Sequence, residues 1–123
     1  QGNQSKRENS EVVKEKVDLT QIHSTVDVDA DFSVGGIDGF RNRVRENFVT
    51  EAVEGEGVLT TTVSFVVEID GSITQVKATG ANADFNREAE RVIRSIKTKW
   101  KPGKKGNQNV RSRFRFPLTM KFE

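Results

Sequence analysis

Side chains that could do covalent chemistry are few in this chain of 123 residues, and they do not stand in catalytic combinations. The absence of cysteine removes thiol nucleophiles, cysteine metal sites and disulfides. We interpret His23 as an isolated surface residue, because no second histidine or cysteine stands at ligand spacing. The acid pairs Asp27/Asp29 and Glu54/Glu56 have the side chains for general acid–base catalysis but no accompanying nucleophile or cleft. We therefore expect no enzymatic activity, no metal and no cofactor.

Basic side chains gather near the C-terminus, where they could bind phosphate groups. The chain has 20 lysine and arginine residues against 18 acidic ones, a net charge of +2, so attraction to a polyanion must come from local clustering. A nucleic-acid-binding domain is therefore one alternative function. The basic cluster comprises Lys97, Lys99, Lys101, Lys104, Lys105, Arg111, Arg113 and Arg115.

The last of these arginines belong to a run, RSRFRFPLTMKF, that alternates basic or polar residues with large apolar ones. Such alternation predicts a β-strand with Phe114, Phe116 and Phe122 in the core and the arginines in solvent. No aromatic platform then remains on the basic face for stacking on bases, which ranks nucleic-acid binding below peptide binding. Pro117 has no amide hydrogen to donate, so its position predicts a strand at the edge of a sheet.

The elements before this strand also follow from apolar periodicity. After the double glycine at residues 35–36, apolar residues share one helical face from Ile37 to Phe48. The run LTTTVSFVVEI alternates as a strand, and Asp70-Gly71 predicts a tight hairpin turn into SITQVKATG. Ile73 and Val76 would fall on opposite faces of a regular strand, so we expect a bulge there.

A second helix is predicted within ADFNREAERVIRSIKTKW, capped by Asp84 or Asn86. Trp100 follows at its end, before Pro102, and we interpret it as a packing anchor. The order helix, strand, strand, helix, strand predicts an α+β fold, in which two helices cover one face of a three-stranded antiparallel sheet. The buried stripe of the second helix comprises Phe85, Ala89, Val92, Ile93 and Ile96.

One folded domain accounts for most of the chain. Residues 1–24 are polar and charged and predict a flexible linker or tail, and residues 25–123 predict the domain. The segment around Val26 and Val28 forms either a short edge strand or an extended lead-in. No apolar run reaches the ~20 residues of a membrane helix, and we interpret the sequence, which begins at Gln1, as a mature fragment.

Several pieces, in this order and spacing, resemble the C-terminal domain of the TonB family of energy transducers. They are the double glycine, the helix after it, the FVVEIDGSITQVK hairpin, the FNREA helix start, the KWKPGKKG turn and the closing RFRFPLTMKF. The resemblance covers roughly residues 29–123. The chain departs from the family at Val34, where a proline often precedes the double glycine.

The resemblance implies a periplasmic domain, tethered to the inner membrane by an N-terminal helix that works with ExbB and ExbD. Such a domain binds the TonB box of an outer-membrane TonB-dependent transporter and transmits force from the proton gradient for uptake of siderophores or other nutrients. Nucleic acid is not expected as a partner. The alternatives are a secreted envelope module of the same fold that binds peptide or protein without a motor, and a homodimer formed through edge strands.

An edge strand would bind its partner by β-strand addition, in which the backbone N–H and C=O groups of the edge recognise the partner. The three arginines of the strand then either pair with acids on the transporter or only protect the edge from aggregation. The predicted partner-binding residues are Asn109, Val110, Arg111, Ser112, Arg113, Phe114, Arg115 and Phe116.

Overall fold

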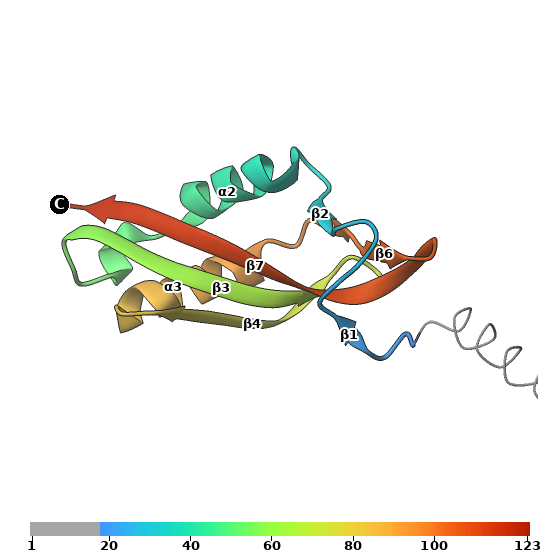
Figure 1. Cartoon of the computed structure of the whole chain (residues 1–123). Helices are drawn as coiled ribbons and strands as arrows, with labels where there is room; N and C mark the ends of the chain where they lie inside the picture. The colour runs from blue at the N-terminus through green and yellow to red at the C-terminus, as the bar shows by residue number, and fades with distance from the viewer. Residues whose placement is uncertain (1–17) are drawn as a thin grey trace, which may run out of the picture.

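Apolar residues at every second position build the central sheet of this protein, seen in a computed structural model that describes residues 18–123 (Figure 1). β3 (Gly57–Val67) and β4 (Ile73–Gly80) form an antiparallel hairpin, and β7 (Gln108–Phe122) pairs antiparallel with the other side of β3. The predicted antiparallel core of the sheet is therefore confirmed, and the terminal strand lies beside the first hairpin strand, as expected.

Four shorter strands surround this core. β1 (Ile22–His23) pairs in parallel with β7, and β6 (Gly103–Lys105) pairs antiparallel with the start of β7, so that the sheet is mixed. β2 (Asp31–Phe32) and β5 (Trp100–Lys101) form a separate two-stranded sheet. β1 lies before the domain boundary expected at residue 25, and residues 1–17 of the predicted tail lie outside the described part of the chain.

Two helices cover one face of the sheet, as predicted. α2 (Gly36–Asn47) buries Phe40 and Val44, and α3 (Ala83–Ser95), with its C-cap Ile96, buries the stripe that the sequence indicated. The ring centroid of Phe40 lies 5.1 Å from that of Phe116, which places α2 over β7. A short 3₁₀ turn, η1 (Thr50–Ala52), follows α2. Within residues 18–123 no helix is long and apolar enough to cross a membrane.

The cap of α3 differs from the prediction. Asn82 is the N-cap, and its side-chain oxygen accepts the Phe85 backbone N–H at 2.8 Å. Asp84 stands inside the first turn, and Asn86 uses its amide to donate to the Gly80 carbonyl at 2.9 Å. The helix begins one residue before Asp84, because Asn82 offers the same capping chemistry earlier in the chain.

The hairpin between β3 and β4 is present, with a longer turn than a two-residue loop. Glu68 and Ser72 close the turn, with the Glu68 N–H 2.8 Å from the Ser72 carbonyl oxygen. The predicted bulge is confirmed: the register shifts between Ser64 and Val66, and Gln75 has φ +55°. The extra residue lets Ile73 and Val76 both pack against the core.

Trp100 is the packing anchor that the sequence indicated. It is buried among four aromatic rings, and its backbone N–H donates to the Gly71 carbonyl at 2.8 Å. Gly71 has φ +89°, and a Cβ there would lie 2.3 Å from the Trp100 carbonyl oxygen, so this contact requires glycine. The rings around Trp100 are those of Phe32, Phe40, Phe65 and Phe114.

Candidate functional site

The backbone of β7 has two edges, and Pro117 identifies which groups lie on each. Residues that face each other in an antiparallel pair alternate between exchanging two hydrogen bonds and pointing their backbone groups away. Pro117 stands opposite Thr62, and since it has no N–H, their backbone groups must point away from each other. Alternation then assigns the neighbours. Phe114, Phe116, Leu118 and Met120 bond to β3, whereas Arg113, Arg115, Thr119 and Lys121 direct their N–H and C=O groups away from it.

The pairing of β3 with β4 supports this assignment. If Val63 exchanges hydrogen bonds with Phe116, it has none left for Ala78, its partner in β4. The Ala78 N–H does point away from β3, because it donates to the Glu90 carboxylate at 2.8 Å.

The outward groups from the Arg113 carbonyl to Lys121 form an edge that has no partner strand among residues 18–123. We call this segment the open edge. The side chains of its odd-numbered residues are exposed, and the even-numbered ones pack against or within the core. At this edge three N–H groups and five carbonyl groups are free of the ladder, because the parallel pairing of His23 with Ser112 uses the Arg113 N–H and Pro117 supplies a carbonyl alone.

The opposite edge of the sheet, along β4, is closed by side chains of α3. Glu90 accepts the Ala78 N–H, Arg94 donates to the Val76 carbonyl at 3.3 Å, and Asn86 donates to the Gly80 carbonyl. Three outward groups of β4 are therefore satisfied within the domain, which leaves fewer for an added strand.

The predicted partner-binding segment, residues 109–116, divides into a covered half and an open half. Asn109 and Val110 pair with β6, while Arg111 and Ser112 pair with Ile22 and His23 of β1. The remaining four residues, Arg113, Phe114, Arg115 and Phe116, lie on the open edge and have β3 as their neighbour on the other side. The two short covering strands carry no apolar periodicity, so the sequence did not reveal them.

Arg111 fixes β1 to the sheet instead of facing a partner. Its guanidinium donates to Glu68 at 2.7 Å and to the Thr20 carbonyl at 2.6 Å. The hydrogen bonds from Arg111 hold the pKa of Glu68 below its ordinary value, and a hydrogen bond from Thr74 lowers this pKa further. The segment that leads into β1 is thus tied to β7 by the hydrogen bond to Thr20, from a guanidinium that a partly buried ion pair with Glu68 holds in place.

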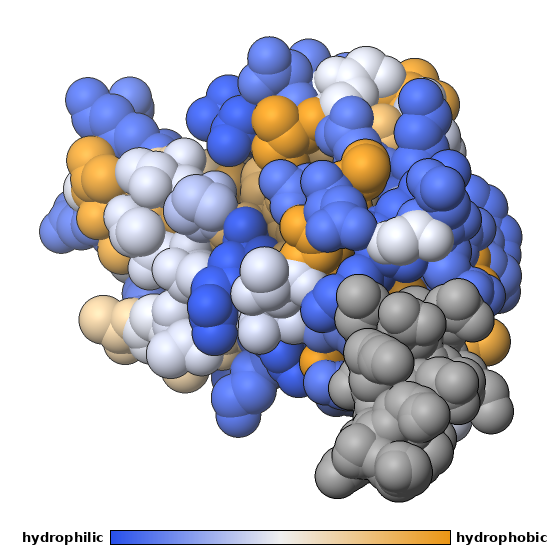
Figure 2. All heavy atoms as spheres, turned by 45° about the vertical axis from the view of Figure 1, so that its right-hand side comes forward, coloured by the Kyte–Doolittle hydropathy of each residue, from blue (hydrophilic) through white to orange (hydrophobic). Residues whose placement is uncertain are grey.

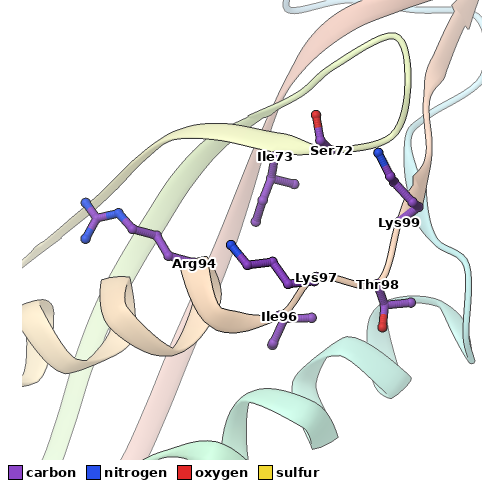
Figure 3. Close-up of a pocket in the computed structure, with 7 residues that line it drawn as sticks. All are labelled: Ser72, Ile73, Arg94, Ile96, Lys97, Thr98 and Lys99. Carbon is purple, nitrogen blue, oxygen red and sulfur yellow. The ribbon is translucent and has the colours of Figure 1, made fainter.

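Lys97, Lys99 and Lys101 of the basic cluster lie in the segment that follows α3. A surface pocket of about 320 Å³ has Ile73 and Ile96 in its lining and three cations at its rim (Figure 3). Lys99 pairs with Asp70 at 3.5 Å, and hydrogen bonds from Ser72 lower the pKa of Asp70 to about 2. The cations of this rim are Arg94, Lys97 and Lys99.

The remaining candidates for chemistry do not come together. His23 is buried, contrary to the surface position expected, because β1 pairs with β7 at this residue. Its Nε2 lies 3.4 Å from the Asp18 carbonyl oxygen. Asp27 accepts the Gly106 N–H at 2.7 Å and so holds a turn. Residues 18–123 contain no group of three potential metal ligands.

One comparison with known proteins identifies a relationship. The family model described as "Gram-negative bacterial TonB protein C-terminal" matches residues 52–122, more than half of the chain. The match begins in η1 and contains β3, β4, α3 and β7, and therefore both edges described above. No curated protein and no solved structure matches this chain.

Proposed function

Because the chain belongs to the family of C-terminal domains of the Gram-negative bacterial TonB protein, we propose that it binds the TonB box of an outer-membrane transporter by β-strand addition. Domains of this family are periplasmic, belong to the energy-coupling machinery of transport and interact with outer-membrane receptors. The family transduces energy and is not one of enzymes.

The observation that carries the proposal is the open edge. An extended peptide beside Arg113–Lys121 would find unpaired donors and acceptors on a strand whose other side is held by eleven register pairs to β3. β3 and the core thus present the edge as a rigid template. We narrow the predicted partner-binding segment to its open half, Arg113 to Phe116, and extend it toward Lys121.

The expected affinity is modest. Each hydrogen bond gained contributes about 0.5–1.5 kcal/mol, and a few of them must offset an association cost of about 4 kcal/mol or more. Recognition through the backbone also places loose demands on the partner's sequence. Such binding suits a domain that must capture and release its partner repeatedly.

The wider machinery is part of the same proposal. The full-length protein is tethered to the inner membrane and acts with ExbB and ExbD through a part that precedes this domain. Force derived from the proton gradient then passes through the domain to the transporter for uptake of a siderophore or another nutrient. A homodimer through edge strands is disfavoured at β7, since pairing two copies there would place lysines and arginines of one copy near those of the other.

Two proline variants test backbone recognition. The N–H of Arg115 points outward and is free, so Arg115→Pro removes a donor from the open edge and leaves the pairing with β3 intact, as Pro117 already does. We expect Arg115→Pro to weaken binding of a TonB-box peptide far more than Arg115→Ala, measured by isothermal titration calorimetry. Equal weakening by the two variants would point to side-chain recognition, and no peptide binding by the wild-type domain would reject the proposal.

Nucleic-acid binding is the alternative that the basic cluster raised, and three contacts speak against it. Arg111 is paired with Glu68, Lys99 is paired with Asp70, and the ring of Phe114 packs 4.9 Å from that of Trp100. No aromatic ring of β7 is left for stacking on bases. Binding of single-stranded DNA at physiological salt, with a steep dependence on salt, would revive this alternative.

A further inference from the structure

The three long strands of the sheet contain no acidic residue, although the chain as a whole has 18. The side chains of these three strands that point away from the helices form a face, here called the open face, on which every charge is positive. Four of its cations are exposed and form no ion pair with another residue of the 18–123 region, whereas the fifth, Arg111, is partly buried and paired with Glu68. The four exposed cations are Lys77 on β4 and Arg113, Arg115 and Lys121 on β7.

Small hydroxyl side chains fill the space between these cations. Thr60 and Thr119 lie opposite each other, with their hydroxyl oxygens 3.2 Å apart, and Arg113 donates to the Ser64 hydroxyl at 3.4 Å. Figure 2 shows pale, weakly polar side chains gathered in the half of the molecule where β3, β4 and the end of β7 run in Figure 1.

The open edge and the open face share the same residues. Arg113, Arg115 and Lys121 direct their backbone groups to the edge and their side chains to the open face. A strand added at the edge lies about 4.8 Å from β7, so its side chains on this face become direct cross-strand neighbours of the three cations. Carboxylates there gain an opposite charge, whereas lysine or arginine would meet a like charge.

The helix side of the same edge has a different character. Phe114 and Met120 are partly buried, and both pack against the core at the boundary where an added strand would lie. Between Phe114 and Met120, Arg41 of α2 lies over the Phe116 ring, 5.4 Å from its centroid. Side chains of an added strand that point toward the helices would therefore extend an apolar surface.

We propose that the strand accepted at the open edge is an extended peptide in which acidic side chains alternate with apolar ones, the acids facing Arg113, Arg115 and Lys121. This inference rests on the strand addition proposed above and names the chemistry of the partner. A one-residue slip would turn every acid toward the core, so the alternation also fixes the register.

Three peptides of equal length test the proposed alternation of acidic and apolar residues. They are alternating Glu and Val, the same residues in two blocks, and alternating Gln and Val. Affinity is measured by fluorescence anisotropy. We expect the alternating Glu peptide to bind about five-fold more tightly than the other two, from two or three exposed cross-strand ion pairs. The preference should decline at high salt, since these pairs are exposed.

Two charge reversals provide a matched pair of variants. Arg115 and Lys77 both stand opposite Ser64, one on each side of β3, so each substitution places a glutamate on the same face. Arg115→Glu should abolish or invert the preference for Glu over Gln. Lys77→Glu, about 10 Å from β7, should change it less than two-fold.

Each contrary outcome has its own meaning. Equal binding of the Glu and Gln peptides, with the backbone amides of the open edge still perturbed in NMR spectra, would overturn this inference and leave strand addition standing. No perturbation of those amides by any peptide, the TonB-box peptide included, would overturn the proposed function itself. A dimer in sedimentation analysis with the open-edge amides protected before peptide is added would replace the peptide by a second copy of the chain.

Discussion

The two outer strands of the sheet differ in what the helices do to their edges. Along β4, three side chains of α3 occupy outward backbone groups at distances of 2.8–3.3 Å. Along β7, no strand of residues 18–123 pairs with the outward side beyond Ser112, and no side chain of this part of the chain bonds to an outward backbone group from Arg115 to Lys121. The difference teaches that an edge strand is available only where the neighbouring helix does not reach it.

The cause lies in where the side chains of α2 go. Arg41 pairs with Asp38 and covers the Phe116 ring, and Arg43 donates to the Thr98 hydroxyl and lies over the Phe32 ring. Neither guanidinium reaches the backbone of β7. α3 instead runs beside β4, where Glu90 accepts a backbone N–H and Arg94 donates to a backbone carbonyl. Only α3 therefore bonds to the outer edge of its strand.

The largest effect on stability should come from a proline at a β7 residue whose backbone N–H bonds to β3. Leu118→Pro removes a hydrogen bond to β3 and a side chain that is 1% exposed, and should cost about 3 kcal/mol or more of the free energy of unfolding. Thr119→Pro removes an outward N–H and should cost less than about 1 kcal/mol. Urea denaturation measures both. Equal losses would mean that the two edges of β7 have been assigned the wrong way round.

An intermediate effect should follow from opening the closed edge. Glu90→Ala leaves the Ala78 N–H without its acceptor and should cost about 1–2 kcal/mol. The same variant should allow added peptide to shift the amide NMR signals of β4, which we expect peptide to leave unchanged in the wild-type domain. Glu46→Ala on the exposed side of α2 is the matched control. If peptide does not shift the β4 amide signals in the Glu90 variant, the hydrogen bonds from α3 side chains are not what keeps that edge closed.

A smaller gain should come from completing the open edge. Pro117→Thr adds the one N–H that is missing between Arg115 and Thr119, and one more hydrogen bond corresponds to about 0.5–1.5 kcal/mol. Peptide affinity should therefore rise about two- to ten-fold, as measured by calorimetry. An unchanged affinity would show that the peptide does not run past residue 117.

The smallest effect concerns the covered start of β7. The pKa of Glu68 lies below its ordinary value of 4.5 because of the hydrogen bonds from Arg111, so the pair stabilises the fold above that pH. This stabilisation is lost as the pH falls through the lowered pKa. Amide chemical shifts of β1 should move over that acidic range, and Glu68→Gln should remove the transition. An unaltered titration in the variant would assign it to another carboxylate.

How far the sequence predicted this site can be judged from β7 itself. Alternation and Pro117 indicated an edge strand with its phenylalanines inward, because both signals are local. The covering of residues 109–112 depends on strands of two and three residues that arrive from distant parts of the chain, and these leave no periodic signal. The capping of β4 depends on the distance between α3 and β4. Asn86 was therefore expected at a helix cap, although its amide binds the Gly80 carbonyl.

The most direct test of the open edge is hydrogen exchange of the β7 amides, followed by NMR with and without a TonB-box peptide. Without peptide, Phe114, Phe116, Leu118 and Met120 should exchange slowly, and Arg115, Thr119 and Lys121 should exchange fast. Peptide should slow the second set and leave the amides of β4 unchanged. If the odd-numbered amides are already protected in the free domain, or stay fast while peptide protects another strand, β7 does not receive the partner.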